Sequence, residues 1–268
     1  RNGVLGSGTN SSCGCGVTLL DCPLWSAALE GVGSVNLAAT AHRMVTLQHA
    51  LLRTRHTRAR LAEGRGRVRT APGVVEALET TARIYRTLSE GEGERLIVDS
   101  SKCPAEAAAL LGRADIDTRI LHIVRDPRAT ALSFRSAKDY IDPMTPARSS
   151  AQWTAFNSAS ELVGVAAPGR YLRLRHEDLC RRPQETVSEV LRFAGLDDAS
   201  PVDEVGKVLL RGNHTVTGNP DRLRHGMSRI SLDERWRTKL ATRDTVVATA
   251  AAAPLLKRYG YPVLARGR

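Results

Sequence analysis

Apolar side chains recur every three or four positions in the first third of the chain. Between residues 37 and 61 they are Leu37, Ala41, Met44, Leu47 and Leu51. That spacing is typical of an amphipathic helix, and the same pattern returns over 73–88. The sequence therefore predicts two helices, one over 37–61 and one over 73–88.

After residue 90 the pattern changes to short apolar runs of strand length, each followed by polar residues and a helical pattern. The runs cover 95–98, 119–124 and 171–174, and the helices that follow them start near Pro104, Arg128 and Pro183. This order is a βαβ rhythm, and runs that are apolar throughout predict buried strands of a parallel sheet. Because such sheets place ligands at the carboxyl ends of their strands, we expect functional residues directly after them.

The last third of the chain is predicted to be helical over 202–210 and 232–259, around a polar loop. No internal repeat or linker divides the sequence, so a single domain over 1–268 is expected. No apolar run approaches the roughly 20 residues of a membrane-spanning helix. The lack of a signal-peptide pattern favours a cytoplasmic location.

Charge narrows the choice of partner. The 268 residues include 39 Lys and Arg against 28 Asp and Glu, a net charge of +11 that favours an anionic partner. Nucleic acid, a membrane surface, or a phosphorylated or sulfated small molecule would each satisfy it. Seven arginines lie between Arg53 and Arg69, a stretch that we interpret as a solvated helix end.

The sharpest local signal is the run Arg125-Asp126-Pro127-Arg128, with Ser133 following. Asp126 is a natural N-cap and Pro127 a natural first helical residue, so the run predicts a strand, a cap and a helix. A helix N-terminus flanked by two arginines would suit a phosphate, and Ser133 would add a hydroxyl donor. The alternative is an arginine that pairs with a carboxylate beside a structural cap.

Several segments, in order, resemble the PAPS-dependent sulfotransferases of the bacterial branch. They are 98–102, 122–129 with Ser133, 171–196, 214–237 and the ending 259–261. The resemblance implies an α/β fold with a P-loop NTPase-like central parallel sheet flanked by helices. It also implies transfer of a sulfuryl group from PAPS, which leaves PAP, to a hydroxyl or amine of a small-molecule or carbohydrate acceptor.

The resemblance also assigns residues to the donor nucleotide. It implies that Arg125 and Ser133 hold the 3′-phosphate together with Arg222 and Arg224 of a basic loop, which includes Gly226. Guanidinium groups grip phosphate oxygens bidentately, which suits this role. Without the resemblance, the two loop arginines would be interpreted as solvated.

For the chemical step, Lys102 follows a predicted strand and is the candidate catalytic residue, with a charge that would stabilise the transferring group. An N-cap for the helix at Pro104 is the simpler role for the serines before it. No residue stands out as the base. His122 is interpreted as a core histidine, while His214 and Glu177 are unranked candidates.

The first strand, phosphosulfate loop and helix of the family pattern are not found. Residues 6–10 have the composition of a loop but no strand before them, so the chain is expected to lack its first βα unit. Cys13 and Cys15 are only two positions apart, and no fourth ligand accompanies them and Cys22. A local structural turn is therefore expected there, and no metal.

Two other hypotheses stay open. A P-loop-like nucleotide-binding or phosphotransfer protein would carry an upstream Gly-x-x-x-x-Gly-Lys-Ser/Thr loop. A basic nucleic-acid-binding protein is disfavoured, because only 4% of the residues are aromatic and no stacking platform is evident. No nucleic-acid partner and no membrane span are expected, and the oligomeric state is unassigned.

Overall fold

The computed structural model describes residues 12–92, 96–136 and 142–263. The chain forms two compact units, each built from two separate stretches. The first unit is Arg1–Thr118 with Leu209–Ser228, and the second unit is Arg119–Val208 with Arg229–Arg268. The single domain expected over 1–268 stays a prediction. The loop-like segment 6–10 lies outside the described residues.

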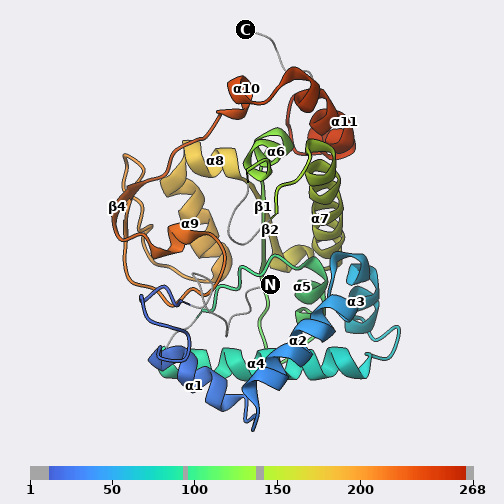
Figure 1. Cartoon of the computed structure of the whole chain (residues 1–268), viewed down its shortest axis with the longest axis vertical. Coiled ribbons are helices and arrows are strands. Elements are labelled where there is room, and N and C mark those ends of the chain that lie inside the picture. Colours follow the sequence, from blue (N-terminus) through green and yellow to red (C-terminus); the bar gives the residue numbers. More distant parts are fainter. Residues whose placement is uncertain (1–11, 93–95, 137–141, 264–268) are drawn as a thin grey trace. The chain divides into compact units, whose positions relative to one another are not determined.

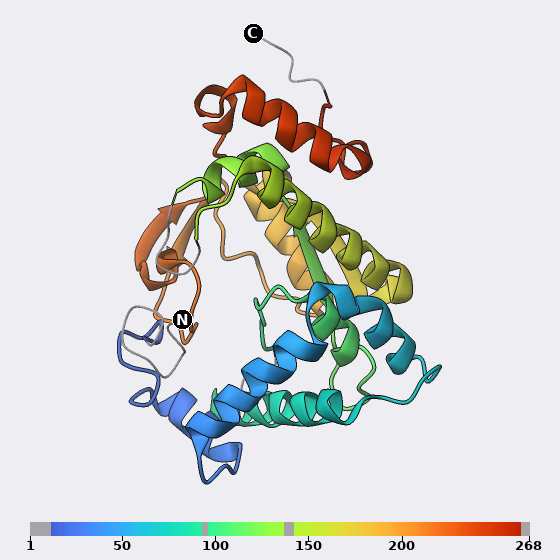
Figure 2. The same ribbon diagram turned by 45° about the vertical axis from the view of Figure 1, so that its right-hand side comes forward.

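Helices make up most of the first unit (Figure 1). They are α1 (Pro23–Gly31), α2 (Leu37–Leu51), the short 3₁₀ turn η2 (Thr54–His56), α3 (Thr57–Gly64), α4 (Pro72–Glu92) and α5 (Pro104–Leu110). In both views α1 and α2 lie against the long α4 (Figures 1 and 2). Leu47, Leu52, Val74, Leu78 and Leu110 form the core between these helices. The predicted helix over 73–88 is confirmed as α4.

The predicted helix over 37–61 is wrong as a single element, because it breaks after Leu51. Arg53 has an extended backbone, with φ −75 and ψ 157, and the chain restarts through η2 into α3. The buried guanidinium of Arg60 donates to the carbonyl oxygen of Leu51 at 2.9 Å and to Glu63 at 2.7 Å. It thereby satisfies one of the carbonyls that a helix end leaves without a partner.

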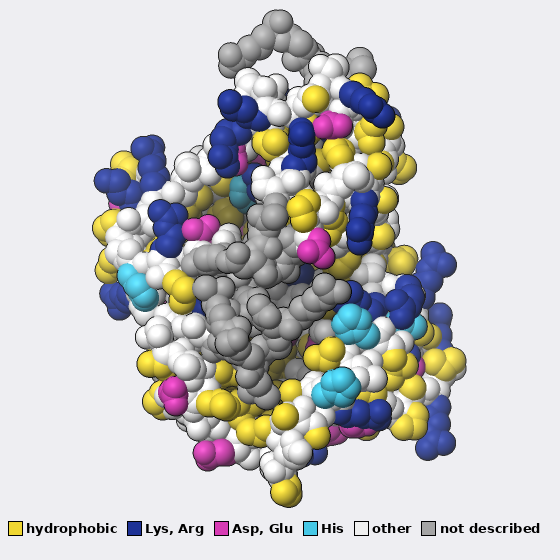
Figure 3. All heavy atoms as spheres, viewed as in Figure 1, with side chains coloured by type: hydrophobic (Ala, Val, Ile, Leu, Met, Phe, Trp, Pro, Cys, Tyr) yellow, Lys and Arg dark blue, Asp and Glu magenta, His cyan; other side chains and the backbone are white. Residues whose placement is uncertain are grey.

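The basic stretch 53–69 is exposed at six of its seven arginines, with Arg60 as the exception. In Figure 3 Lys and Arg side chains gather over α3 at the right-hand edge of the face shown. The interpretation of this stretch as a solvated helix end therefore fits all of these arginines except Arg60, which is part of the packing.

The second unit is a small parallel sheet with helices around it. The strands β1 (Ile120–Val124) and β2 (Tyr171–Arg175) pair in parallel, with Ile120 opposite Tyr171 and Val124 opposite Arg175. The helices are α6 (Pro127–Phe134), α7 (Pro146–Ala166), α8 (His176–Arg181), α9 (Pro183–Ala194), α10 (Trp236–Lys239) and α11 (Thr242–Arg258), with the 3₁₀ turn η3 (Pro168–Arg170). The α/β class is confirmed, while the P-loop-like arrangement stays a prediction.

Local signals account for several of these elements. Pro127 and Pro183 each occupy the first turn of a helix, and Gly195 ends α9 with a left-handed backbone, as the sequence predicts. Trp153 of α7 and Leu256 of α11 pack with Val124 of β1 in the core of this unit. These contacts fix the strand end at which α6 begins.

Two predicted elements are wrong. The run 95–98 forms no strand in its described part, 96–98, where Leu96 and Val98 are 41% and 81% exposed. A strand needs a hydrogen-bonded neighbour, and no described strand pairs with this run. The stretch 202–210 is not helical, because Asp203 accepts hydrogen bonds from two backbone N–H groups and Gly206 has a positive φ. This turn leads into β3 (Lys207–Leu210), which pairs with β4 (Gly226–Arg229).

Candidate functional site

The turn from β1 into α6 is built as the sequence predicts. The Asp126 carboxylate accepts a hydrogen bond from the backbone N–H of Arg128 at 2.8 Å, so it caps the helix, and Pro127 follows as the first helical residue. The Trp153 indole N–H donates to the carbonyl oxygen of Arg125 at 2.9 Å. The backbone of Arg125 is therefore held at the carboxyl end of β1.

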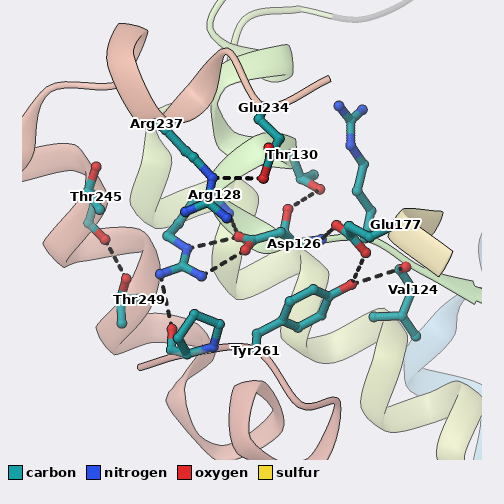
Figure 4. Close-up of polar contacts among 12 residues, drawn as sticks. Val124, Asp126, Arg128, Thr130, Glu177, Glu234, Arg237, Thr245, Thr249 and Tyr261 are labelled. Carbon is teal, nitrogen blue, oxygen red and sulfur yellow. Dashed lines mark hydrogen bonds and ion pairs between the residues drawn. The ribbon is translucent and has the colours of Figure 1, made fainter. Parts of the chain in front are cut away.

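Arg128 does not face solvent, contrary to its expected role beside a phosphate. Its guanidinium is fully buried and donates to both carboxylate oxygens of Asp126, at 2.9 and 2.7 Å (Figure 4). It also donates to the carbonyl oxygen of Pro262 at 3.1 Å and lies 4.4 Å from the centre of the Trp236 ring. Arg128 is thus the structural arginine of this run, and the helix N-terminus is occupied by the chain's own carboxylate.

Glu177 completes the same buried network. One of its oxygens accepts from the backbone N–H of Asp126 at 3.0 Å, and the other accepts from the Tyr261 hydroxyl at 2.6 Å. Burial and the neighbouring Glu177 raise the pKa of Tyr261 far above its usual range. Figure 4 shows Tyr261 and Glu177 meeting beside β1. Since both oxygens of Glu177 are engaged, its geometry is that of a positioning residue.

Arg125, unlike Arg128, is partly exposed and is not held in a close ion pair by any described residue. Its side chain is 31% exposed, and its nearest acidic partner, Asp233, lies 3.7 Å away. Asp233 is already held by Arg235 through two contacts of 2.9 and 2.8 Å, which keep its pKa well below the usual range. Burial and the nearby Arg125 charge lower the pKa of His176. Arg125 is therefore a loosely held cation at a strand end, as a phosphate-binding arginine requires.

Ser133 lies on the last turn of α6, half-buried, in the same strand–helix unit as Arg125. Arg125 lies in the turn before α6 and Ser133 lies in α6, so both belong to the strand–helix unit formed by β1 and α6. A cavity of about 110 Å³ lies nearby, lined by Asp126, Arg175, Arg237 and others. Pockets for small molecules usually measure roughly 300–1,000 Å³, so this cavity is too small for a nucleotide.

Lys102 belongs to the first unit and is exposed, with a left-handed backbone at φ +62. Asp99 accepts the backbone N–H of Ser101 at 2.7 Å and also the Tyr85 hydroxyl, which fixes the turn before it. A non-glycine residue in this conformation costs roughly 1–3 kcal/mol and persists where its surroundings impose it. The N-cap expected of Ser100 or Ser101 is wrong, because Cys103 precedes α5 and makes no side-chain cap bond.

The remaining predicted residues lie in the loop 211–226 of the first unit. Arg222 is half-buried and donates to the carbonyl oxygen of Thr215 at 3.2 Å. Arg224 is exposed and lies 3.6 Å from Asp221, an ion pair open to solvent. Gly226 has φ +88, a conformation that favours glycine at the start of β4. The ligand roles of these residues stay predictions.

Several residues that shape the site have roles that the sequence does not predict. The roles of Tyr85, Asp233 and Tyr261 depend on contacts across 14, 108 and 84 positions. No local pattern reports such contacts. The available hints were a carboxylate directly after a strand, at Glu177, and the place of Asp233 and Tyr261 in segments that resemble the family.

The similarity to known proteins covers the part of the chain that contains this strand–helix turn. Residues 27–200 match the Sulfotransferase family, and this range holds β1, β2 and the turn at Arg125. The chain belongs to the sulfotransferase family.

Curated relatives are similar over shorter stretches. Carbohydrate sulfotransferase 3 of Homo sapiens is 25% identical over 166 residues, which cover 54% of this chain and 34% of the relative. Carbohydrate sulfotransferase 7 of Mus musculus is 32% identical over 93 residues, which cover 35% of this chain and 19% of the relative. The chain thus spans about a third or less of the length of these relatives. No solved structure matches.

Among the described residues, no helix is both long and apolar enough to cross a membrane. The cytoplasmic location expected from the sequence stays a prediction.

Proposed function

We propose that this chain is a PAPS-dependent sulfotransferase that transfers a sulfuryl group to a hydroxyl or amine of a carbohydrate or another small-molecule acceptor. The observation that carries the proposal is the position of Arg125 and Ser133. Both lie inside the range 27–200 that matches the family, on one strand–helix unit. The names of the relatives, both carbohydrate sulfotransferases, favour a carbohydrate acceptor.

The residues present fit a nucleotide with an extra phosphate. Arg125 is partly exposed, and within the described part of the chain its ion pair is the 3.7 Å contact with Asp233, which Arg235 already holds, so a phosphate would compete well for its guanidinium. Ser133 would donate its hydroxyl to the same phosphate. Arg222 and Arg224 would add charge from their loop, and the positive φ of Gly226 would let that loop turn back into β4.

Bound PAPS would supply the activated sulfuryl group. Lys102 would place its ammonium where negative charge develops on the transferring group. Its left-handed backbone supports this role, because strained backbone is retained chiefly where its position matters. The turn at Asp99, which Tyr85 holds, would fix the backbone of Lys102. The Lys102 side chain could then still move with the reacting atoms.

Binding of PAP to the full chain, measured by calorimetry, tests the proposal. We expect PAP to bind, and adenosine 5′-phosphate to bind at least about tenfold more weakly, because it lacks the 3′-phosphate that Arg125 would hold. Transfer of labelled sulfate from PAPS to carbohydrate acceptors would then define the acceptor. Absence of binding by both PAP and PAPS would refute the proposal.

A further inference from the structure

Four metal-ligating side chains converge in the first unit. Cys13, Cys15, Cys22 and His214 each place one ligand atom so that all four atoms lie within 4.8 Å of one another. Cys13 and Cys22 are completely buried, and all of these cysteines are free thiols. His214, the fourth ligand, is not evident from the sequence because it lies 192 positions from Cys22.

The distances suit a tetrahedral ion. The His214 Nδ1 atom lies 3.6 Å from the sulfur of Cys13 and 3.2 Å from that of Cys22. Zinc bonds of about 2.3 Å to sulfur and about 2.0 Å to nitrogen, at tetrahedral angles, separate the two ligand atoms by about 3.5 Å. The observed separations therefore leave room for the ion with only small shifts of the side chains.

The backbone around the cysteines is arranged to hold this geometry. The N–H of Gly16 donates to the carbonyl oxygen of Cys13 at 2.9 Å, which closes a tight turn, and Gly16 has φ +95. A Cβ at Gly14 would meet the side-chain oxygen of Asn213 at 2.1 Å, so only glycine fits there. This tight turn accounts for the spacing of Cys13 and Cys15, which is shorter than in most structural zinc sites.

A second set of contacts holds the histidine. The Trp25 indole N–H donates to the carbonyl oxygen of His214 at 2.7 Å, and the N–H of Gly14 donates to the carbonyl oxygen of Thr215 at 3.0 Å. Such contacts around the ligands fix their orientation. The cysteine turn and the histidine loop are therefore joined even before an ion is considered.

The ligand set identifies the class of metal. Three thiolates and one imidazole are soft and borderline ligands in a tetrahedral arrangement, the set that zinc takes in structural sites. All four positions would be filled by protein, so no position is open for a substrate. We propose that Cys13, Cys15, Cys22 and His214 form a structural Zn²⁺ site.

The site has a consequence for the neighbouring loop. Asn213, directly before the histidine ligand, donates to the carbonyl oxygen of Arg222 at 2.9 Å, and Arg222 donates back to Thr215 at 3.2 Å. The ion would therefore fasten the loop that carries Arg222. The effect on nucleotide binding rests on the proposed function, whereas the zinc site itself does not.

Metal analysis of the purified full chain tests the site. After dialysis against metal-free buffer, we expect inductively coupled plasma mass spectrometry to find about one zinc ion per chain. Cys22→Ser and His214→Ala should each lower the zinc content at least about tenfold. Cys180→Ser and His225→Ala, which alter a cysteine and a histidine outside the group, should leave it unchanged.

A measurement on the unaltered chain covers the case in which those variants fail to fold. Replacement of the metal by Co²⁺ should give the intense visible bands of tetrahedral cobalt and the near-ultraviolet charge transfer of thiolate ligands. Alkylation in denaturant without a reductant should modify all five cysteines. A chain without metal and without these bands, or one in which Cys13 and Cys22 are joined in a disulfide, would overturn the site. Neither result depends on whether PAP binds.

Discussion

The guanidinium of Arg128 donates to both carboxylate oxygens of Asp126 in a buried pair, three residues after the partly exposed Arg125. The two arginines of one short motif therefore have opposite physical roles. Arg128 neutralises the cap of α6, and Arg125 keeps its charge available at the end of β1. The sequence alone does not distinguish the roles of the two arginines.

This difference predicts losses of stability of unequal size. Arg128→Ala would leave Asp126 buried without its partner, which costs about 3–5 kcal/mol in comparable pairs. Arg125→Ala removes a partly exposed side chain with one long ion pair, so the free energy of unfolding should change by less than about 1 kcal/mol. Urea unfolding of both variants measures this. Equal losses would contradict the assigned roles.

The contact between Tyr261 and Glu177 should couple the end of the chain to β1. Tyr261→Phe would leave one buried carboxylate oxygen without its donor, at a cost of about 1–3 kcal/mol in the free energy of unfolding. In a double-mutant cycle with Glu177→Gln, the two losses should not add. Additive losses would mean that the hydroxyl and the carboxylate do not act on each other.

The left-handed backbone at Lys102 predicts that a glycine there increases stability while it lowers activity. Lys102→Gly should raise the free energy of unfolding by about 1 kcal/mol, because the strain of about 1–3 kcal/mol that it relieves exceeds the roughly 0.5–1 kcal/mol of extra chain entropy that glycine loses on folding. The same change should lower the rate of sulfuryl transfer at least about a hundredfold, since the ammonium is lost. Thr217→Gly, at a second residue with positive φ, serves as the control for stability. Full activity in Lys102→Gly would remove Lys102 from the mechanism.

His122 predicts a dependence of stability on pH. Its Nε2 atom lies 2.8 Å from the side-chain oxygen of Asn157, and burial lowers its pKa from the ordinary 6.5. The unfolded chain therefore binds a proton at a pH where the folded chain does not. The free energy of unfolding should fall as the pH drops below about 6.5, and level off below the folded pKa.

Urea unfolding at about pH 7.5 and about pH 5 checks this dependence. His122→Gln keeps a polar side chain but cannot titrate. Its free energy of unfolding should therefore fall less between the two pH values than that of the unaltered chain. His176 also has a pKa lowered by burial, and it contributes equally to both proteins. An identical loss in both would contradict the effect at His122.

The sequence predicted the elements whose signals are local. The cap at Asp126, the prolines that open α6 and α9, and the left-handed Gly195 all follow from residues within one turn of one another. The order of strand and helix around Arg125 was correct for the same reason.

The errors arose where a distant contact decides the structure. An apolar run such as 95–98 becomes a strand only beside a partner strand, and none of the described strands pairs with it. The break after Leu51 depends on Arg60, which turns inward to cap the helix. The helix α7 was missed because its small and polar residues give no apolar stripe, although Trp153 anchors it to the end of β1.

We propose that Arg125 holds the 3′-phosphate of the donor nucleotide, and titration of PAP into matched variants tests this role. Arg182→Ala, which removes an exposed arginine of the same unit with its own surface ion pair, is the control. We predict that Arg125→Ala raises the Kd for PAP about 5- to 150-fold, equivalent to about 1–3 kcal/mol, while Arg182→Ala leaves it unchanged. An unchanged Kd in Arg125→Ala would exclude Arg125 as the residue that holds this phosphate.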